Sequence, residues 1–287
     1  MTQEEFFERL GIKDSFTPPI SSGYSQLDKI INGGFSNEVV TIASRPGHGK
    51  TAFLFNLMMN FSVKQDLKGI AAFPRLSKKD FVLYLTSWVI NSDVFDKEVT
   101  EAILEDVYPH FMNLSTKRVK TLHRILPLDE IFTMAENEEV NYIILDDYFR
   151  SYDLQHDADR FANDYVKIQE FIARKNISVF VSLLTSRTAE KRGGEMKPRL
   201  NDIYAGDLVS TYSHKVIQLY RPEEYEIMCR EDGISSKGDL ELMIQQNSKG
   251  RKGSMRFFFV PPGRIQEDIN SELKSNFDRE ERKNNPY

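Results

Sequence analysis

The sequence contains very little cysteine and no long apolar run, and both absences narrow the class of protein. Cys229 is the single cysteine in 287 residues, so an intramolecular disulfide is excluded and a reducing compartment is favoured. No apolar stretch approaches the roughly 20 residues that a membrane-spanning helix needs. The polar start, residues 1–5 (MTQEE), has no signal-peptide character. We therefore expect a cytoplasmic protein with no membrane partner.

An excess of positive charge is also lacking. The chain has 38 Lys and Arg against 43 Asp and Glu, a net charge of −5, so a nucleic-acid site must be a local basic patch. The five histidines show no metal-ligand spacing, and no metal other than Mg²⁺ is implied. An apolar content of 40% is ordinary for a globular chain, and this length can bury one sizeable core.

Apolar runs alternate with segments of helical periodicity along most of the chain. The predicted strands are residues 39–43, 69–73, 142–146, 178–184, 215–220, 240–245 and 255–260. The predicted helices follow residue 50 and cover about 79–90, 127–137 and 162–175. Strands separated by helices predict an α/β fold with a mainly parallel twisted sheet flanked by helices. The last two strands are joined by a Gly/Lys/Arg turn, which predicts a C-terminal antiparallel hairpin.

A glycine-rich segment follows the first predicted strand. Residues 44–51 (SRPGHGKT) match the phosphate-binding loop pattern except that a serine stands in place of its first glycine. The glycines allow successive N–H groups to point at one phosphate, the lysine reaches the β- and γ-phosphates, and the threonine offers a hydroxyl to Mg²⁺. A chance Gly-Lys-Thr in a surface loop is the alternative, which the strand before and the helix after disfavour. The expected nucleotide-binding residues are Ser44, Arg45, Pro46, Gly47, His48, Gly49, Lys50, Thr51 and Ala52.

A second motif, residues 142–147 (YIILDD), is a buried strand that ends in two carboxylates. Beside a phosphate-binding loop, the first carboxylate holds Mg²⁺ and the next acidic residue can polarise an attacking water. An ordinary strand running into an acidic turn is the alternative. We predict that Thr51 and Asp146 hold Mg²⁺ and that Lys50, Asp146 and Asp147 are the catalytic residues.

Several segments occur in the order found in one family. They are residues 4–11 (EEFFERLG), 22–28 (SGYSQLD), 33–35 (GGF), 43–53 (ASRPGHGKTAF), 147–149 (DYF) and 220–223 (YRPE). The Arg-Pro pair inside the phosphate-binding loop is the most diagnostic of these. From residue 4 to about 263, the chain resembles the motor domain of replicative DNA helicases of the DnaB type, which have a RecA-like fold.

This resemblance implies a P-loop NTPase that uses ATP and Mg²⁺ on single-stranded DNA. It also implies a homo-oligomer, a hexameric ring, with a separate replication or loader protein as a further partner. The domain organisation expected is a linker-helix remnant at 1–16, a RecA-like ATPase domain at 17–264 and a polar tail at 265–287. In the family the linker helix docks on the neighbouring subunit, a role that Phe6, Phe7 and Leu10 could serve here.

The chain departs from the family at positions that carry hydrolysis. The family has Ser-Leu-Glu-Met after its second strand, with the Glu as catalytic base, whereas residues 73–77 read FPRLS and align Leu76 with that Glu. The family's γ-phosphate-sensing Gln aligns with Leu184. Its arginine finger aligns with Ser248, so either the finger is lost or a neighbouring basic residue has taken over in trans. The candidates for that role are Lys249, Arg251 and Lys252.

Two explanations remain open. In the first, the motor hydrolyses ATP and Asp147 substitutes for the missing Glu. In the second, the protein binds ATP to assemble but turns it over slowly, because losing a base costs roughly 10²–10⁴ in rate and losing an arginine finger roughly 10³–10⁵.

A basic stretch follows the predicted strand at 178–184. In the family this region is a loop that faces DNA, and a ring of subunits would multiply the positive charge. A solvated surface run is the alternative. The family's DNA-contacting Arg-Glu-Ser-Gly reads YAGD at residues 204–207. The expected DNA-binding residues are Arg187, Lys191, Arg192, Lys197, Arg199 and Gly206.

Overall fold

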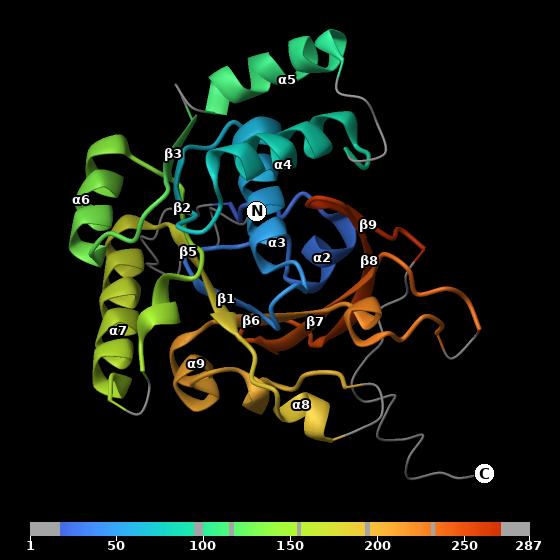
Figure 1. Cartoon of the computed structure of the whole chain (residues 1–287). Coiled ribbons are helices and arrows are strands. Elements are labelled where there is room, and N and C mark those ends of the chain that lie inside the picture. Colours follow the sequence, from blue (N-terminus) through green and yellow to red (C-terminus); the bar gives the residue numbers. More distant parts are fainter. Residues whose placement is uncertain are drawn as a thin grey trace, which may run out of the picture.

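A nine-stranded sheet organises the chain (Figure 1). The computed structural model describes residues 18–94, 100–114, 118–153, 156–192, 196–230 and 233–270. The strand order within these residues is β3-β2-β4-β5-β1-β6-β7-β8-β9. The strands are β1 (Val39–Ser44), β2 (Gly69–Ala72), β3 (Val119–Leu122), β4 (Tyr142–Leu145), β5 (Ser178–Leu184), β6 (Lys215–Tyr220), β7 (Asp239–Asn247), β8 (Gly253–Val260) and β9 (Arg264–Glu267).

The six neighbouring strands β3-β2-β4-β5-β1-β6 are parallel to one another. Their carboxyl ends meet at one edge of the sheet, here called the carboxyl edge. Within it, β1 lies between β5 and β6, with Ser44 opposite both Leu184 and Leu219. On the other side of β5, β4 is paired so that Leu145 lies opposite Val181. The segments that follow β1, β4 and β5 are therefore brought together by strand order.

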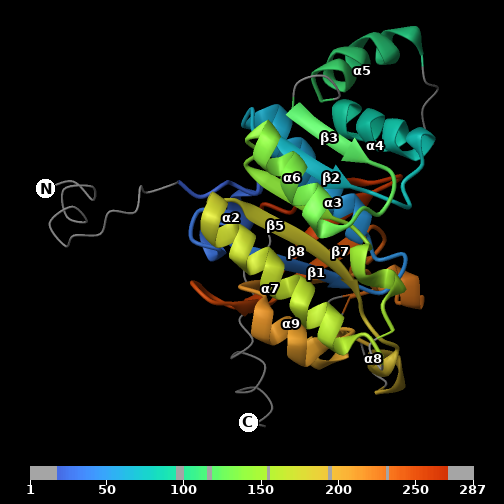
Figure 2. The same cartoon turned by 90° about the vertical axis from the view of Figure 1, so that its left-hand side faces the viewer.

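Helices cover both faces of the sheet (Figures 1 and 2). One core packs α2 (Ser25–Ile30), α3 (Lys50–Met59) and α4 (Lys78–Ile90) against the sheet, with α5 (Glu101–Asn113) outside α4. The other core packs α6 (Leu128–Glu138), α7 (Ala158–Lys175) and α9 (Gly206–Tyr212). Strand β4 shows why apolar runs mark these strands: Tyr142 and Ile144 enter the first core, and Ile143 and Leu145 the second.

The last three strands are antiparallel. The register pairs Tyr220 with Glu241 and Lys215 with Asn247, so β7 runs back along β6 and the β7–β8 turn lies at the edge opposite the carboxyl edge. At about 3.3 Å per residue, this turn is roughly 20 Å from the segment that follows β1. The expected α/β fold, with a mainly parallel sheet and a C-terminal antiparallel hairpin, is confirmed.

Some elements were not predicted. Strand β3, with the sequence VKTL, is an edge strand that is only partly buried, and β9 has the sequence RIQE, so neither shows an apolar run. β9 pairs with β8 and extends the sheet to Glu267, beyond the expected domain boundary at 264. The expected linker remnant at 1–16 and most of the tail at 265–287 lie outside the described residues. Among those described, no helix combines the length and hydrophobicity that a membrane span requires.

Candidate nucleotide-binding site

The segment between β1 and α3 has the backbone of a phosphate-binding loop. Gly47 and Gly49 have positive φ angles of 84° and 89°, a conformation that glycine adopts without steric cost. Helix α3 begins at Lys50, directly after Gly49. The free N–H groups of its first turn therefore stand at the carboxyl edge, where a helix N-terminus favours an anion.

Two side chains of the loop turn into the protein. The Arg45 guanidinium donates to Glu190 at 2.9 Å and to the Thr185 carbonyl at 3.0 Å, which ties the loop to the end of β5 and to α8 (Thr188–Lys191). His48 is 3% exposed, and its Nδ1 accepts the backbone N–H of Arg221 at 2.9 Å. Burial, reinforced by the nearby Arg221 and Arg45 charges, lowers the pKa of His48 to about 4. Arg45 and His48 therefore brace the loop with their side chains, and any contact of His48 with nucleotide falls to its backbone.

The carboxylate at the end of β4 is held beside the loop. Asp146 is 1% exposed, and its two oxygens accept the Thr51 hydroxyl at 2.7 Å and the Ser182 hydroxyl at 2.6 Å. Burial raises the pKa of Asp146, against the lowering effect of the Lys50 charge. A buried carboxylate next to a threonine hydroxyl is a hard-oxygen pair that suits Mg²⁺. Thr51 and Asp146 thus fit the metal for which they were predicted.

Asp147 lies among cations. One of its oxygens is 3.3 Å from the Lys50 ammonium, and the other is 3.2 Å from Arg150 and 4.0 Å from Arg75. The carboxylate is 8% exposed, whereas the Arg150 and Arg75 side chains are 44% and 56% exposed. The three residues predicted as catalytic, Lys50, Asp146 and Asp147, are therefore brought together at the carboxyl edge.

The residue after β2 that faces this site is Arg75. The sequence alignment placed Leu76 at the position of the family's catalytic Glu, but Leu76 is 6% exposed and belongs to the first core. Leu184 ends β5, so an apolar side chain stands where the family has a glutamine amide. Among the described residues, Asp147 is thus the one carboxylate that forms an ion pair with Lys50.

The basic hairpin residues lie away from this loop. Lys249, Arg251 and Lys252 belong to the β7–β8 turn at the opposite edge of the sheet, where the Ser248 N–H donates to the His214 carbonyl at 2.9 Å. They cannot reach the loop of their own chain across the roughly 20 Å of β6. The geometry is compatible with the prediction that they act on a neighbouring subunit.

The basic stretch after β5 is a short helix, α8, and flanking segments, where a loop alone was expected. Arg187, Lys191 and Arg199 are exposed. Arg192 makes two hydrogen bonds of 2.6 Å to the buried Asp202, and the Lys197 ammonium is 2.8 Å from Glu241. Gly206 begins α9. Of the six residues predicted to bind DNA, Arg192 and Lys197 thus have carboxylate partners within the chain.

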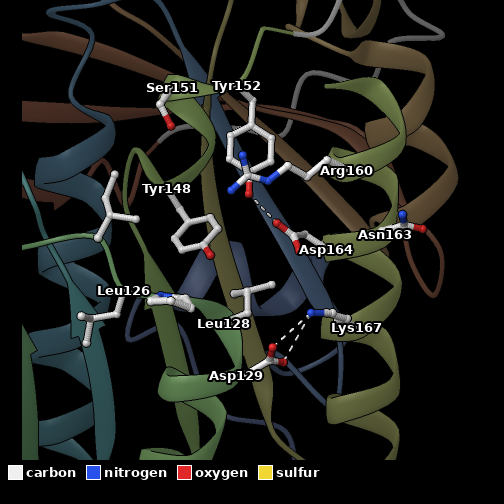
Figure 3. A pocket seen from close by; sticks show the side chains of 12 residues that line it. Leu126, Leu128, Asp129, Tyr148, Ser151, Tyr152, Arg160, Asn163, Asp164 and Lys167 are labelled. Atoms are coloured by element: carbon white, nitrogen blue, oxygen red, sulfur yellow. Dashed lines mark hydrogen bonds and ion pairs between the residues drawn. The ribbon is translucent and has the colours of Figure 1, made fainter. Parts of the chain in front are cut away.

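The described residues also enclose a cavity of about 620 Å³ (Figure 3). It is lined by the start of α6, the short helix η3 (Tyr148–Ser151) and α7, and none of Lys50, Asp146 or Asp147 lines it. Arg160 stacks on the Tyr152 ring at 4.4 Å, and the Tyr152 hydroxyl donates to Asp164 at 2.5 Å. These contacts engage three of the polar side chains that line the cavity.

Sequence reasoning missed three residues of the site. Ser182 accepts the backbone N–H of Asp147 at 2.8 Å while it donates to Asp146, so it orients the Asp146 carboxylate and fixes the backbone of Asp147. A polar residue in the middle of the mainly apolar β5 run was the available signal. Arg150 lies three residues after Asp147 and meets it through the short helix η3, whereas Arg75 reaches Asp147 only because β2 lies next to β4.

The fold and its loop are those of the RecA-like class of α/β domains. Residues 19–264 match the family described as DnaB-like helicase C terminal domain, and the chain belongs to this family. It is 22% identical over 279 residues to the replicative DNA helicase DnaB of Mycoplasma pneumoniae, covering 90% of this chain and 58% of that protein. For the Mycoplasma genitalium helicase DnaB the values are 23% over 256 residues, 84% and 54%. The chain spans about half the length of these helicases.

Solved structures show the same fold. One solved ATPase domain superposes with a TM-score of 0.74 at 16% identity, covering 92% of this chain and 96% of that chain. A DnaB-like replicative helicase, solved in a study of its interactions with primase, gives a TM-score of 0.71 at 16% identity and covers 92% and 65%. The resemblance read from the sequence is confirmed.

Proposed function

We propose that this chain is an ATP-binding DnaB-like helicase motor that translocates on or unwinds DNA in replication. The observation that carries the proposal is the junction of the phosphate-binding loop with the end of β4. There Thr51 contacts Asp146 at 2.7 Å and Lys50 contacts Asp147 at 3.3 Å. A lysine, a hydroxyl and two carboxylates at a helix N-terminus are the groups that bind and activate a nucleoside triphosphate.

ATP would lie on the loop with its phosphates at the first turn of α3. Thr51 and Asp146 would hold Mg²⁺, which neutralises charge on the β- and γ-phosphates. Ser182 donates to the Asp146 carboxylate and so keeps it oriented toward Thr51. Asp147 is the residue for which we propose the role of base, toward water at the γ-phosphate.

The same proposal includes an assembly on DNA. Single-stranded DNA would contact the exposed Arg187, Lys191 and Arg199 after β5, with Arg192 and Lys197 shaping that surface. The β7–β8 turn, at the opposite edge from the loop, would complete the site of an adjacent subunit in a ring. Membership of a helicase family and similarity to replicative helicases support the helicase role, and the distance across the sheet supports completion in trans.

A second candidate is an ATP-binding assembly or loading factor of the same fold without efficient unwinding. The cations around Asp147 favour it, because a carboxylate held in ion pairs with Lys50 and Arg150 is not free to turn toward an attacking water. Leu184 and Ser248 align with the family's γ-phosphate-sensing Gln and its arginine finger, and the absence of these groups at the two positions also favours the assembly factor.

Steady-state ATP hydrolysis with and without single-stranded DNA separates the two candidates. Turnover that DNA stimulates supports the motor, whereas nucleotide binding with no turnover under either condition supports the assembly factor. Light scattering with a non-hydrolysable ATP analogue tests the ring: a single 33.3 kDa species at high concentration would rule it out. If a ring forms, deletion of residues 1–14 should give monomers and lower any ATPase activity.

A further inference from the structure

The turn between β2 and α4 presents one arginine to the nucleotide site. The Leu76 N–H donates to the Phe73 carbonyl at 3.2 Å, which closes a turn with Pro74 in its second position. Proline pre-sets the φ angle that this position needs. Leu76 is buried in the core, and its carbonyl is 3.0 Å from His123 Nδ1. The backbone of Arg75 is therefore held from both sides, while its side chain is 56% exposed.

The Arg75 guanidinium points at Asp147. Its Nε is 4.0 Å from one Asp147 oxygen, and the Lys50 ammonium is 3.3 Å from the other. Within the described residues, Asp147 is the one carboxylate that Arg75 contacts, and the guanidinium donates no hydrogen bond to any of them. Arg75 thus stands next to the phosphate-binding lysine with its donors available.

The charge around Asp147 is unbalanced in a way that favours an anion. Lys50, Arg75 and Arg150 all contact Asp147, and the neighbouring carboxylate, Asp146, is engaged by the Thr51 and Ser182 hydroxyls, so three cations face two carboxylates. The two arginines nearer the loop backbone are paired: Arg45 with Glu190, and Arg221 with two glutamates. The surplus positive charge is therefore concentrated at the end of β2, on the side of Lys50 that a terminal phosphate would occupy. Arginine also binds phosphate oxygens through two parallel donors, which lysine cannot do.

We propose that Arg75 binds the terminal phosphate of a nucleoside triphosphate from within the same chain. Asp147 is the counter-ion of Lys50 and Arg75 when no phosphate is bound, and the γ-phosphate exchanges with it. The proposal rests on the nucleotide site proposed above and adds a specificity to it. A diphosphate keeps its contacts with the loop and with Lys50 but ends short of Arg75, so Arg75 makes the site selective for triphosphate.

The test compares the binding of AMP-PNP and of ADP, both with Mg²⁺, by calorimetry. Arg75→Gln should weaken AMP-PNP binding roughly tenfold or more, the worth of a hydrogen bond to a charged group, and change ADP binding less than twofold. Arg75→Lys should recover part of the AMP-PNP affinity. Arg174→Gln is the charge-matched control: Arg174 is 65% exposed, lies at the end of α7 and is 3.9 Å from Glu136. It should leave both affinities unchanged.

Each other result overturns the proposal. If Arg75→Gln weakens the binding of AMP-PNP and of ADP equally, Arg75 acts through its charge in general and does not contact the terminal phosphate. If it changes neither affinity, Arg75 only forms an ion pair at the surface. If the unsubstituted chain binds neither nucleotide, the proposed nucleotide function fails as well. If it binds both and Arg75→Gln keeps their ratio, the inference alone fails. Unfolding midpoints of the variants confirm that each one is folded.

Discussion

Replacing Asp147 by Asn removes one charge from the centre of the site and changes little else. Asp147 has a φ angle of 50°, in the left-handed region that Asn tolerates well. Asn has the same shape and can still accept a hydrogen bond. The substitution therefore isolates the charge of the carboxylate.

The cost to stability follows from the contacts. The contact with Lys50 is 3.3 Å long, and both side chains are 8% exposed. At an effective dielectric constant near 20, such a pair attracts by about 5 kcal/mol before the cost of removing both charges from water. Arg150 and Arg75 are about half exposed, so each adds a small amount. We expect Asp147→Asn to lower the free energy of unfolding by about 1–2 kcal/mol, which lowers Tm by about 3–6 °C.

Thermal unfolding with and without Mg²⁺ and AMP-PNP measures this effect. Nucleotide should abolish most of the difference in Tm between Asp147→Asn and the unsubstituted chain, because the phosphate takes the place of the carboxylate beside Lys50. If the unsubstituted chain hydrolyses ATP, the variant should be slower by roughly 10²–10⁴. Asp129→Asn is the control, since Asp129 is 76% exposed and contacts Lys167 on the surface. An unchanged Tm in the absence of nucleotide, together with an unchanged hydrolysis rate, would refute the reasoning.

Three further predictions concern the loop, the metal and the sheet. The folded-state pKa of His48 is about 4, below its ordinary value of 6.5. As the pH drops from 6.5 to 4, the unfolded chain takes up a proton on His48 before the folded chain does. The free energy of unfolding therefore falls over this range, by up to roughly 3 kcal/mol. His48→Asn keeps the acceptor for the Arg221 N–H, and chemical unfolding at pH 7.5 and 5 should show a smaller loss. Thr51→Val should reduce the Mg²⁺-dependent part of ATP-analogue affinity roughly tenfold, with affinity in EDTA unchanged. Lys215 and Glu38 form an ion pair in which the side chains are 2% and 0% exposed. Lys215→Met should lower the free energy of unfolding, measured with denaturant, by roughly 3–5 kcal/mol, because it leaves a buried carboxylate without its partner. Adding Glu38→Leu should restore most of that free energy.

The fold was predictable where strands are buried on both faces. β1, β4, β5 and β6 have mainly apolar sequences because a core packs on each face of them, and the boundaries predicted from the sequence are within one residue of those observed. Strand β9 was not predicted because it has four residues and one apolar side chain, and contacts with other segments stabilise it. Its last residue, Glu267, accepts the Ser25 and Gln26 N–H groups at 2.9 and 2.5 Å. Such a strand exists only in its tertiary context.

The site was predictable only as far as local motifs extend. The loop and the end of β4 each carry a local pattern, and their proximity follows from a parallel sheet. The contact between Arg75 and Asp147 follows from no local pattern. Arg75 follows β2, and β2 lies next to β4 although β3 and several helices separate them in sequence. Strand order is a global property of the fold, so the surroundings of Asp147 became visible only in three dimensions.

Binding of Mg²⁺ and AMP-PNP to the unsubstituted chain and to Lys50→Ala tests the central claim most directly. Lys50 is 7% exposed at the start of α3, and its ammonium faces Asp147 and the loop. The account predicts saturable binding to the unsubstituted chain and none, at the same concentrations, to a folded Lys50→Ala variant. Equal affinity of the two proteins for the nucleotide would contradict the assignment of this site.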